Sequence, residues 1–103
     1  MGKKQAIRSL ANSIALISTH KLLVEHTNKP ESIKHLKDEV ADYSNDAFEK
    51  SREYNWTKEE LEEIKAVSIK ETKNRLKKYQ DITIKESDIP EAVIDTMQEL
   101  LLI

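Results

Sequence analysis

The residues that could bind a metal ion form one stripe in the second quarter of the chain. They are His35, Glu39, Asp42 and Asp46. On a helix, their spacings of four, three and four stack them within about 60° of one another. Imidazole and carboxylate groups are ligands for divalent cations, so the stripe could serve a metal-dependent hydrolase. It lies roughly 120° from the apolar face of the same helix, so we expect it to face water and bind no metal.

A second set of candidate residues consists of cations that could contact the phosphates of a nucleic acid. They are Lys70, Lys73, Arg75, Lys77 and Lys78. Glu71 interrupts the set, and no helix-turn-helix signature accompanies it. Cations at the carboxyl end of a helix also complement its dipole. We therefore favour a solvated face and keep a nucleic-acid-associated regulator as an alternative function.

Several kinds of active site are excluded by what the sequence lacks. The chain has no cysteine and one glycine, and its three histidines do not have the spacing of a ligand set. It contains no nucleophile-elbow motif and no P-loop, and a phosphate cradle of bare backbone amides is hard to build with a single glycine. These absences predict a protein that is not an enzyme and needs no cofactor.

Three segments have the pattern of a helix start, with a capping oxygen three residues before a glutamate. These are residues 28–31, 57–60 and 88–91. The middle one is the clearest, because Trp56 and Leu61 flank it in "NWTKEELEE" and could form a hydrophobic staple. The four glutamates of this stretch suit the positive end of a helix dipole. We therefore interpret the stretch as a helix start and not as a catalytic site.

Four helices are predicted, over about 3–26, 29–53, 58–79 and 89–102. An extended segment over 80–88 precedes the last helix. Short connections favour antiparallel neighbours. With 103 residues and three Gly and Pro residues in total, the chain is expected to form one domain, 1–103, that is an all-α, up-and-down bundle of four helices.

Apolar residues define one face on the second and fourth helices. On the second helix they are Ile33, Leu36, Val40, Tyr43 and Ala47, and on the fourth they are Ile89, Val93, Met97, Leu100 and Leu101. The third helix has a weaker face, because Ser68 and Thr72 occupy its middle. Either the bundle narrows there or a hydroxyl meets a polar partner.

The first helix is apolar on two sides. One side holds Ile7, Leu10, Ile14 and Ile17. Leu16 and Leu23 lie roughly opposite, with His20 near them. Such a helix is either central in its own bundle or shared with a second copy. Leu101 and Leu102 belong to an apolar carboxyl-terminal run that also needs cover. These five residues are the predicted interface of a homodimer.

These features predict a small, non-catalytic, helical protein-interaction or regulatory module. Charged residues make up 35% of the chain with a net charge of −2, which offers no global field for nucleic acid. The amino-terminal apolar run is too short to span a bilayer, so we expect a cytoplasmic protein without membrane insertion. In size and helical plan the chain resembles bacteriocin immunity proteins. That resemblance implies binding to a membrane receptor complex and is a third alternative.

Overall fold

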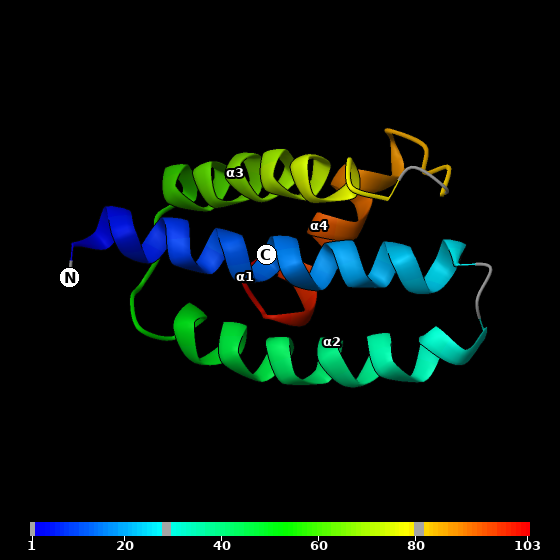
Figure 1. Ribbon diagram of the computed structural model, residues 1–103. Helices are drawn as coiled ribbons and strands as arrows, with labels where there is room; N and C mark the ends of the chain where they lie inside the picture. The colour runs from blue at the N-terminus through cyan, green and yellow to red at the C-terminus, as the bar shows by residue number, and fades with distance from the viewer. Residues whose placement is uncertain (1, 28–29, 80–81) are drawn as a thin grey trace.

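The computed structural model describes residues 2–27, 30–79 and 82–103. These residues form four helices: α1 (Lys3–His26), α2 (Pro30–Ser51), α3 (Lys58–Leu76) and α4 (Asp88–Glu99). The described part of the chain contains no strand. The predicted all-α fold with four helices is confirmed, and helices that follow one another in the chain run in opposite directions, with α4 crossing obliquely (Figure 1).

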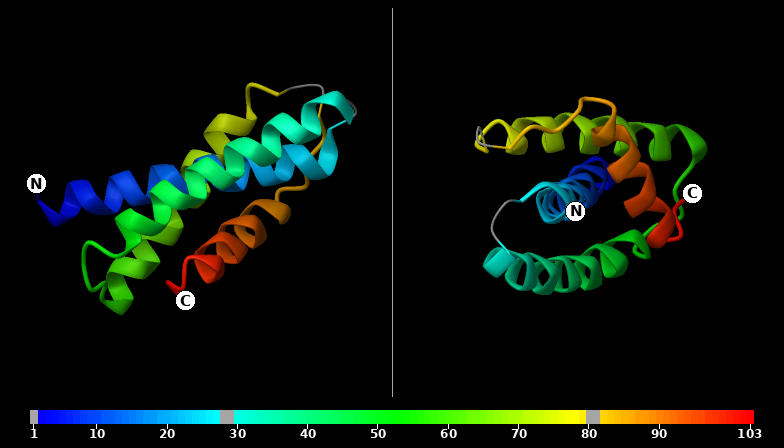
Figure 2. Two further views of the ribbon diagram at one scale, coloured as in Figure 1. Left: turned by 90° about the horizontal axis from the view of Figure 1, so that it is seen from below. Right: turned by 90° about the vertical axis from the view of Figure 1, so that its right-hand side faces the viewer.

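The first helix lies at the centre of the bundle. It packs against α2, α3 and α4, which lie on three sides of it in the end-on view (Figure 2). The buried side chains on α1 include Leu10, Ile14, Ile17 and Leu22. Of the two explanations for an α1 that is apolar on two sides, the structure therefore shows the central position. The arrangement is not a bundle with one helix at each corner of a square, in which α1 and α3 would be diagonal neighbours. Here α1 and α3 run in the same direction and pack directly against each other (Figure 1).

The start of α3 has the predicted capping box. The Glu60 backbone N–H donates to Thr57 Oγ1 over 3.1 Å, and the Thr57 N–H donates to the Glu60 carboxylate over 2.8 Å. Both donors would otherwise lack an intrahelical partner. Trp56 and Leu61, the two residues of the predicted staple, are both partly buried against the main core cluster.

The cap predicted at Asp88 is wrong. Asp88 is already the first residue of α4, and the residue before it, Ser87, makes no side-chain cap hydrogen bond. The backbone N–H of Asp88 donates instead to the Lys85 carbonyl over 2.9 Å, so a backbone turn starts this helix. The cap predicted at Asn28 lies outside the described residues.

The contact between α1 and α3 is lined by small and hydroxyl-bearing residues. Ser68 is fully buried, and its hydroxyl donates to the Ile64 carbonyl over 2.6 Å and to the Ala11 carbonyl over 3.3 Å. Thr72, also buried, donates to the Ser68 carbonyl over 2.7 Å. The bundle therefore narrows at this level, and the hydroxyls also find polar partners, one of them on α1.

Within the described residues, the second helix packs against one neighbouring helix, since its backbone closely approaches α1 alone. Of its predicted apolar face, Ala47 is buried, Val40 and Tyr43 are half-buried against the core, and Ile33 and Leu36 are half-buried. Burial of apolar area is the main stabilising contribution in a bundle, so α2 is held less strongly than its length implies.

The segment predicted to be extended before α4 is irregular where it is described. Residues 83–85 have no regular secondary structure and 86–87 form a turn, while residues 80 and 81 lie outside the described chain. Ile84 packs against a small cluster around Leu22 and Ile89, and Ile82 is half-buried. The segment connects α3 to α4 and covers this end of the core.

The carboxyl end of α4 comes earlier than predicted because the backbone reverses at Leu101. Leu101 has φ 61°, in the left-handed region that favours glycine. Its N–H donates to the Gln98 carbonyl over 3.0 Å, and the Leu102 N–H donates to the Met97 carbonyl over 2.9 Å. These two bonds form a Schellman motif, which usually has glycine at the position of Leu101.

Replacing Leu101 with glycine is expected to stabilise the fold by about 0.5–1 kcal/mol. The left-handed conformation costs a non-glycine residue roughly 1–2 kcal/mol, and the greater freedom of glycine in the unfolded chain offsets roughly 0.4–1 kcal/mol of that gain. Urea denaturation of wild type and Leu101→Gly measures the difference. Leu101→Ala, which keeps the Cβ atom, is the control and should gain much less.

Candidate interaction surface

The largest exposed apolar side chains of the described residues gather mainly at one end of the molecule. Leu101 is 75% exposed and Ile103 is 55% exposed. Phe48, near the end of α2, is exposed and lines a groove with Leu100, and the Arg52 guanidinium stacks 4.6 Å from the centre of its ring. We call Phe48, Arg52, Tyr54, Leu101 and Ile103 the carboxyl-terminal patch. Tyr79, the other large exposed hydrophobic residue, lies at the far end of α3.

A groove of about 460 Å³ runs beside Leu101. Its walls come from the end of α2, the link to α3, the first turn of α3 and the carboxyl-terminal segment. The lining residues are Ser51, Arg52, Tyr54, Asn55, Trp56, Leu61, Leu100, Leu101 and Leu102. Figure 2 shows the carboxyl-terminal segment (red) beside the last turns of α2. The patch therefore combines a projecting leucine with a partly apolar hollow next to it.

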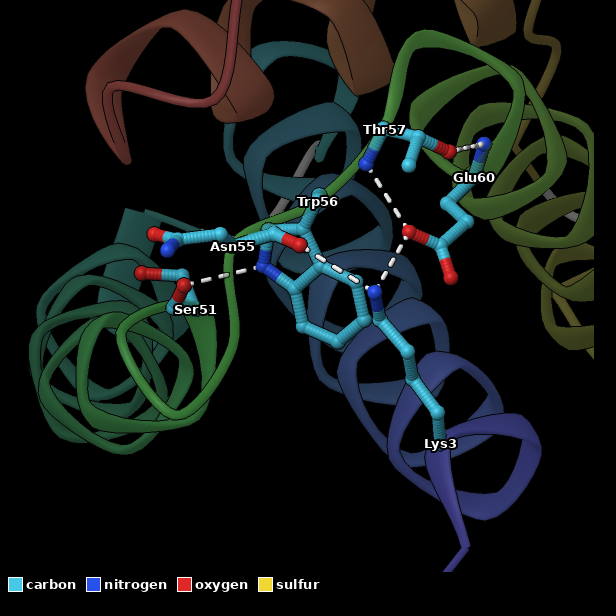
Figure 3. A network of polar contacts seen from close by, with 6 residues as sticks. All are labelled: Lys3, Ser51, Asn55, Trp56, Thr57 and Glu60. Carbon is cyan, nitrogen blue, oxygen red and sulfur yellow. Dashed lines mark hydrogen bonds and ion pairs between the residues drawn. The ribbon is translucent and has the colours of Figure 1, made fainter.

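One wall of this groove is held by a network around Trp56 (Figure 3). The Trp56 indole N–H donates to the Ser51 carbonyl over 2.9 Å. The Lys3 ammonium lies 5.8 Å from the centre of the indole ring, donates to the Asn55 carbonyl over 3.1 Å and pairs with Glu60 at 2.8 Å. Together these contacts join the start of α1, the link after α2 and the start of α3. These contacts hold one wall of the groove in place.

The same network lowers the pKa of Glu60. The hydrogen bond from Lys3 is the largest cause, and the hydrogen bond from the Thr57 backbone follows. Because the pKa of Glu60 is lower in the folded state, its contribution to stability is present above the pKa of the unfolded chain. It is lost as the pH falls through the lowered value.

Removing Lys3 is expected to raise the pKa of Glu60 back toward its ordinary value of 4.5. The measurement is an NMR titration of the Glu60 carboxyl carbon in wild type and Lys3→Met. Lys4→Met, at the exposed neighbouring lysine, is the matched control and should leave the titration unchanged. An equal shift in both variants would mean that general charge, and not this contact, sets the pKa.

The predicted interface on α1 is largely covered within the single chain. Leu23 is only 3% exposed, so it offers almost no surface to a second copy, and Leu16 is half-buried. The His20 ring lies against α2, where it pairs with Glu39 and contacts the edge of the Tyr43 ring. Leu101 and Leu102 lie instead at the carboxyl-terminal patch, and Leu102 is half-buried against the core.

Two carboxylates of the acidic stripe on α2 contact histidine or lysine side chains of the same chain. Glu39 pairs with His35 at 2.7 Å and also with His20 of α1. Asp46 pairs with Lys50 at 3.0 Å and accepts a hydrogen bond from the Ser13 hydroxyl over 3.3 Å. Asp42 is exposed. In the part of the chain that the structure describes, no group of three or more His, Asp or Glu side chains is arranged to hold a metal ion.

The basic residues at the carboxyl end of α3 and just after it differ in their surroundings. Lys73 pairs with Glu86 at 3.1 Å. Arg75 is half-buried, and among the described atoms its Nε is buried without a hydrogen-bond partner. Lys70, Lys77 and Lys78 are exposed. Three exposed lysines give a weak electrostatic attraction for a phosphate backbone.

The sequence did not indicate Phe48, Arg52 and Tyr54 as surface residues of interest. Arg52 and Tyr54 are polar or amphipathic residues in the link after α2. Phe48 comes directly after Ala47, the last residue of the predicted apolar face of α2. An aromatic residue next to a predicted core face, followed four residues later by arginine, is the only local signal. Their gathering near Leu101 depends on where the bundle places the end of α4.

None of the described helices has the length and apolar content that a membrane crossing requires. Comparison with known proteins gave no identification: no family model matches this chain, and neither does any curated protein or solved structure.

Proposed function

We propose that this protein is a non-catalytic helical interaction module that associates with a second copy of itself through the carboxyl-terminal patch. The observation that carries the proposal is Leu101. It is 75% exposed, and its left-handed backbone is unfavourable for leucine. Glycine would suit this position better in the isolated fold, so the leucine side chain is better explained by a contact outside the chain.

The patch has the geometry for pairing about a two-fold axis. In such an interface, the same surface of each copy contacts the other, so a projection must lie next to a hollow that fits it. Leu101 projects beside the 460 Å³ groove that it helps to line. In the proposed dimer, Leu101 of each copy enters the groove of its partner.

The association is expected to be weak. Complete burial of one leucine side chain contributes about 1.5–3 kcal/mol, and stable complexes usually bury about 800 Å² on each partner. The patch consists of a few side chains around one groove, so a dissociation constant of about 10 µM or weaker is expected. Exposed charges around the patch, including Glu53 and Arg52, would set the orientation.

Sedimentation velocity over about 5–500 µM tests the proposal. The weight-average mass of the wild type should rise with concentration, and Leu101→Asp should remain monomeric. Leu101→Gly should also associate at least about tenfold more weakly, although its monomer is the more stable one. Loss of association together with a gain in stability cannot come from misfolding.

Tyr79→Asp is the matched control. It places the same charge on an exposed hydrophobic residue at the opposite end of α3, outside the patch, and it should associate like the wild type. The proposal fails if the wild type remains a monomer over the whole range. It also fails if Leu101→Asp and the wild type associate equally.

A further inference from the structure

The His20 side chain has hydrogen-bond acceptors at both of its ring nitrogens. Its Nδ1 lies 2.8 Å from the Leu16 carbonyl, one turn earlier on α1. Its Nε2 is in contact with Glu39 Oε2 on α2. The side chain is 12% exposed, and the edge of the Tyr43 ring closes one side of it, with ring centres 5.3 Å apart.

A neutral imidazole cannot satisfy this geometry. It carries one N–H and one lone pair, whereas a backbone carbonyl and a carboxylate both accept hydrogen bonds and donate none. With one proton on the ring, one nitrogen would direct its lone pair at an oxygen in a mostly buried site, which is unfavourable. With a proton on each nitrogen, both contacts are hydrogen bonds, and the bond to Glu39 is charge-assisted.

We propose that His20 is a protonation-dependent clasp between α1 and α2. With both nitrogens protonated, the ring ties the Leu16 turn of α1 to Glu39 of α2. When the second proton leaves, one of the two contacts loses its hydrogen and sets two lone pairs against each other. The ring then no longer bonds to both Leu16 and Glu39, and α2 is held less firmly to the bundle. Histidine is the side chain that ordinarily changes charge between about pH 5 and 8, so α2 is held more firmly at the acidic end of this range.

Glu39 is the charged group that faces His20 from α2. The other oxygen of Glu39 pairs with His35 Nε2 at 2.7 Å, so one carboxylate lies between two imidazoles. Lys21, the nearest cation along α1, is directed to Glu99 of α4 at 2.7 Å. Among the described residues, the polar and ring contacts found for His20 come from α1 and α2 alone.

Among the described residues, a second polar tie between these helices joins Ser13 to an aspartate–lysine pair. Ser13 of α1 donates to Asp46 over 3.3 Å and accepts from Lys50 over 3.0 Å, and Asp46 and Lys50 pair with each other. Aspartate and lysine ordinarily keep their charges between about pH 5 and 8. Because α2 closely approaches α1 alone within the described chain, loss of the His20 tie should affect α2 much more than α3.

Hydrogen exchange of backbone amides tests the clasp. The quantity is the protection of α2 amides divided by that of α3 amides, corrected for intrinsic exchange rates, which removes any global change in stability. In the wild type this ratio should fall about tenfold between pH ~5.5 and ~8.5, as expected for loss of a charge-assisted bond. In His20→Gln, which cannot titrate, the ratio should not depend on pH.

His35→Gln is the matched control, because it removes the exposed partner of the same carboxylate and keeps His20. Its ratio should still fall over the same pH range. A wild-type ratio that is constant with pH overturns the proposal, and so does an equal fall in His20→Gln.

Nitrogen-15 NMR of the wild-type ring provides a readout that needs no variant. The number of protons on the His20 ring should fall from two to one over the same pH range in which α2 loosens. The proposal would be contradicted if the His20 ring carried one proton while the α2 amides kept their full protection against hydrogen exchange. The clasp lies apart from the carboxyl-terminal patch, so the two proposals stand or fall separately.

Discussion

Replacing Ile14 with alanine is expected to destabilise the folded protein by about 2–5 kcal/mol. Ile14 is fully buried on the helix that packs against all three others. Removing three carbon atoms there loses their burial and leaves a cavity that several helices would have to move to fill. Such a cost is a large part of the roughly 5–15 kcal/mol that stabilises a typical domain.

Urea denaturation followed by circular dichroism measures this cost. Ile103→Ala is the matched control, since it makes the same change at an exposed residue, and it should change stability by about 0.5 kcal/mol or less. If Ile14→Ala and Ile103→Ala cost the same, α1 would not be the central helix. The experiment therefore tests the arrangement of the bundle as well as one contact.

Replacing Ser68 with leucine is expected to destabilise the fold by about 1–3 kcal/mol. By its position on α3, leucine would appear to improve an apolar face that serine interrupts. The structure leaves no room for it, because Ser68 is fully buried and lies close enough to α1 to donate to the Ala11 carbonyl over 3.3 Å. A larger side chain would push α1 and α3 apart.

Two controls separate crowding from other effects. Ser68→Ala removes the hydroxyl without adding volume and should cost about 1 kcal/mol or less. Ala66→Leu adds a leucine at an exposed position of the same helix and should be nearly neutral. Equal stability of Ser68→Leu and wild type would show that α1 and α3 are not in close contact at this level.

The sequence alone determined the elements of this protein because the forces that form them are local. The capping box at Thr57 and Glu60 depends on residues three apart, and it is present as predicted. The all-α class and the number of helices follow from periodicity and from the scarcity of turn residues. Backbone hydrogen bonds at the ends of α4 were less predictable. A turn starts the helix at Asp88 without a side-chain cap, and Leu101 ends it in a conformation that leucine rarely adopts.

Only the tertiary structure decided which surfaces are covered. Periodicity shows that α1 is apolar on two sides, but it cannot say whether the second side meets another helix of the same chain or another molecule. Leu23 is buried within the chain because α1 takes the central position, whereas Leu101 remains exposed because α4 ends at the surface. Likewise, the His20 contact joins residues from two helices, and hydrogen bonding to Glu39 depends on how those helices are set side by side. Local sequence fixes a helix and its faces, but the pairing of faces depends on long-range packing.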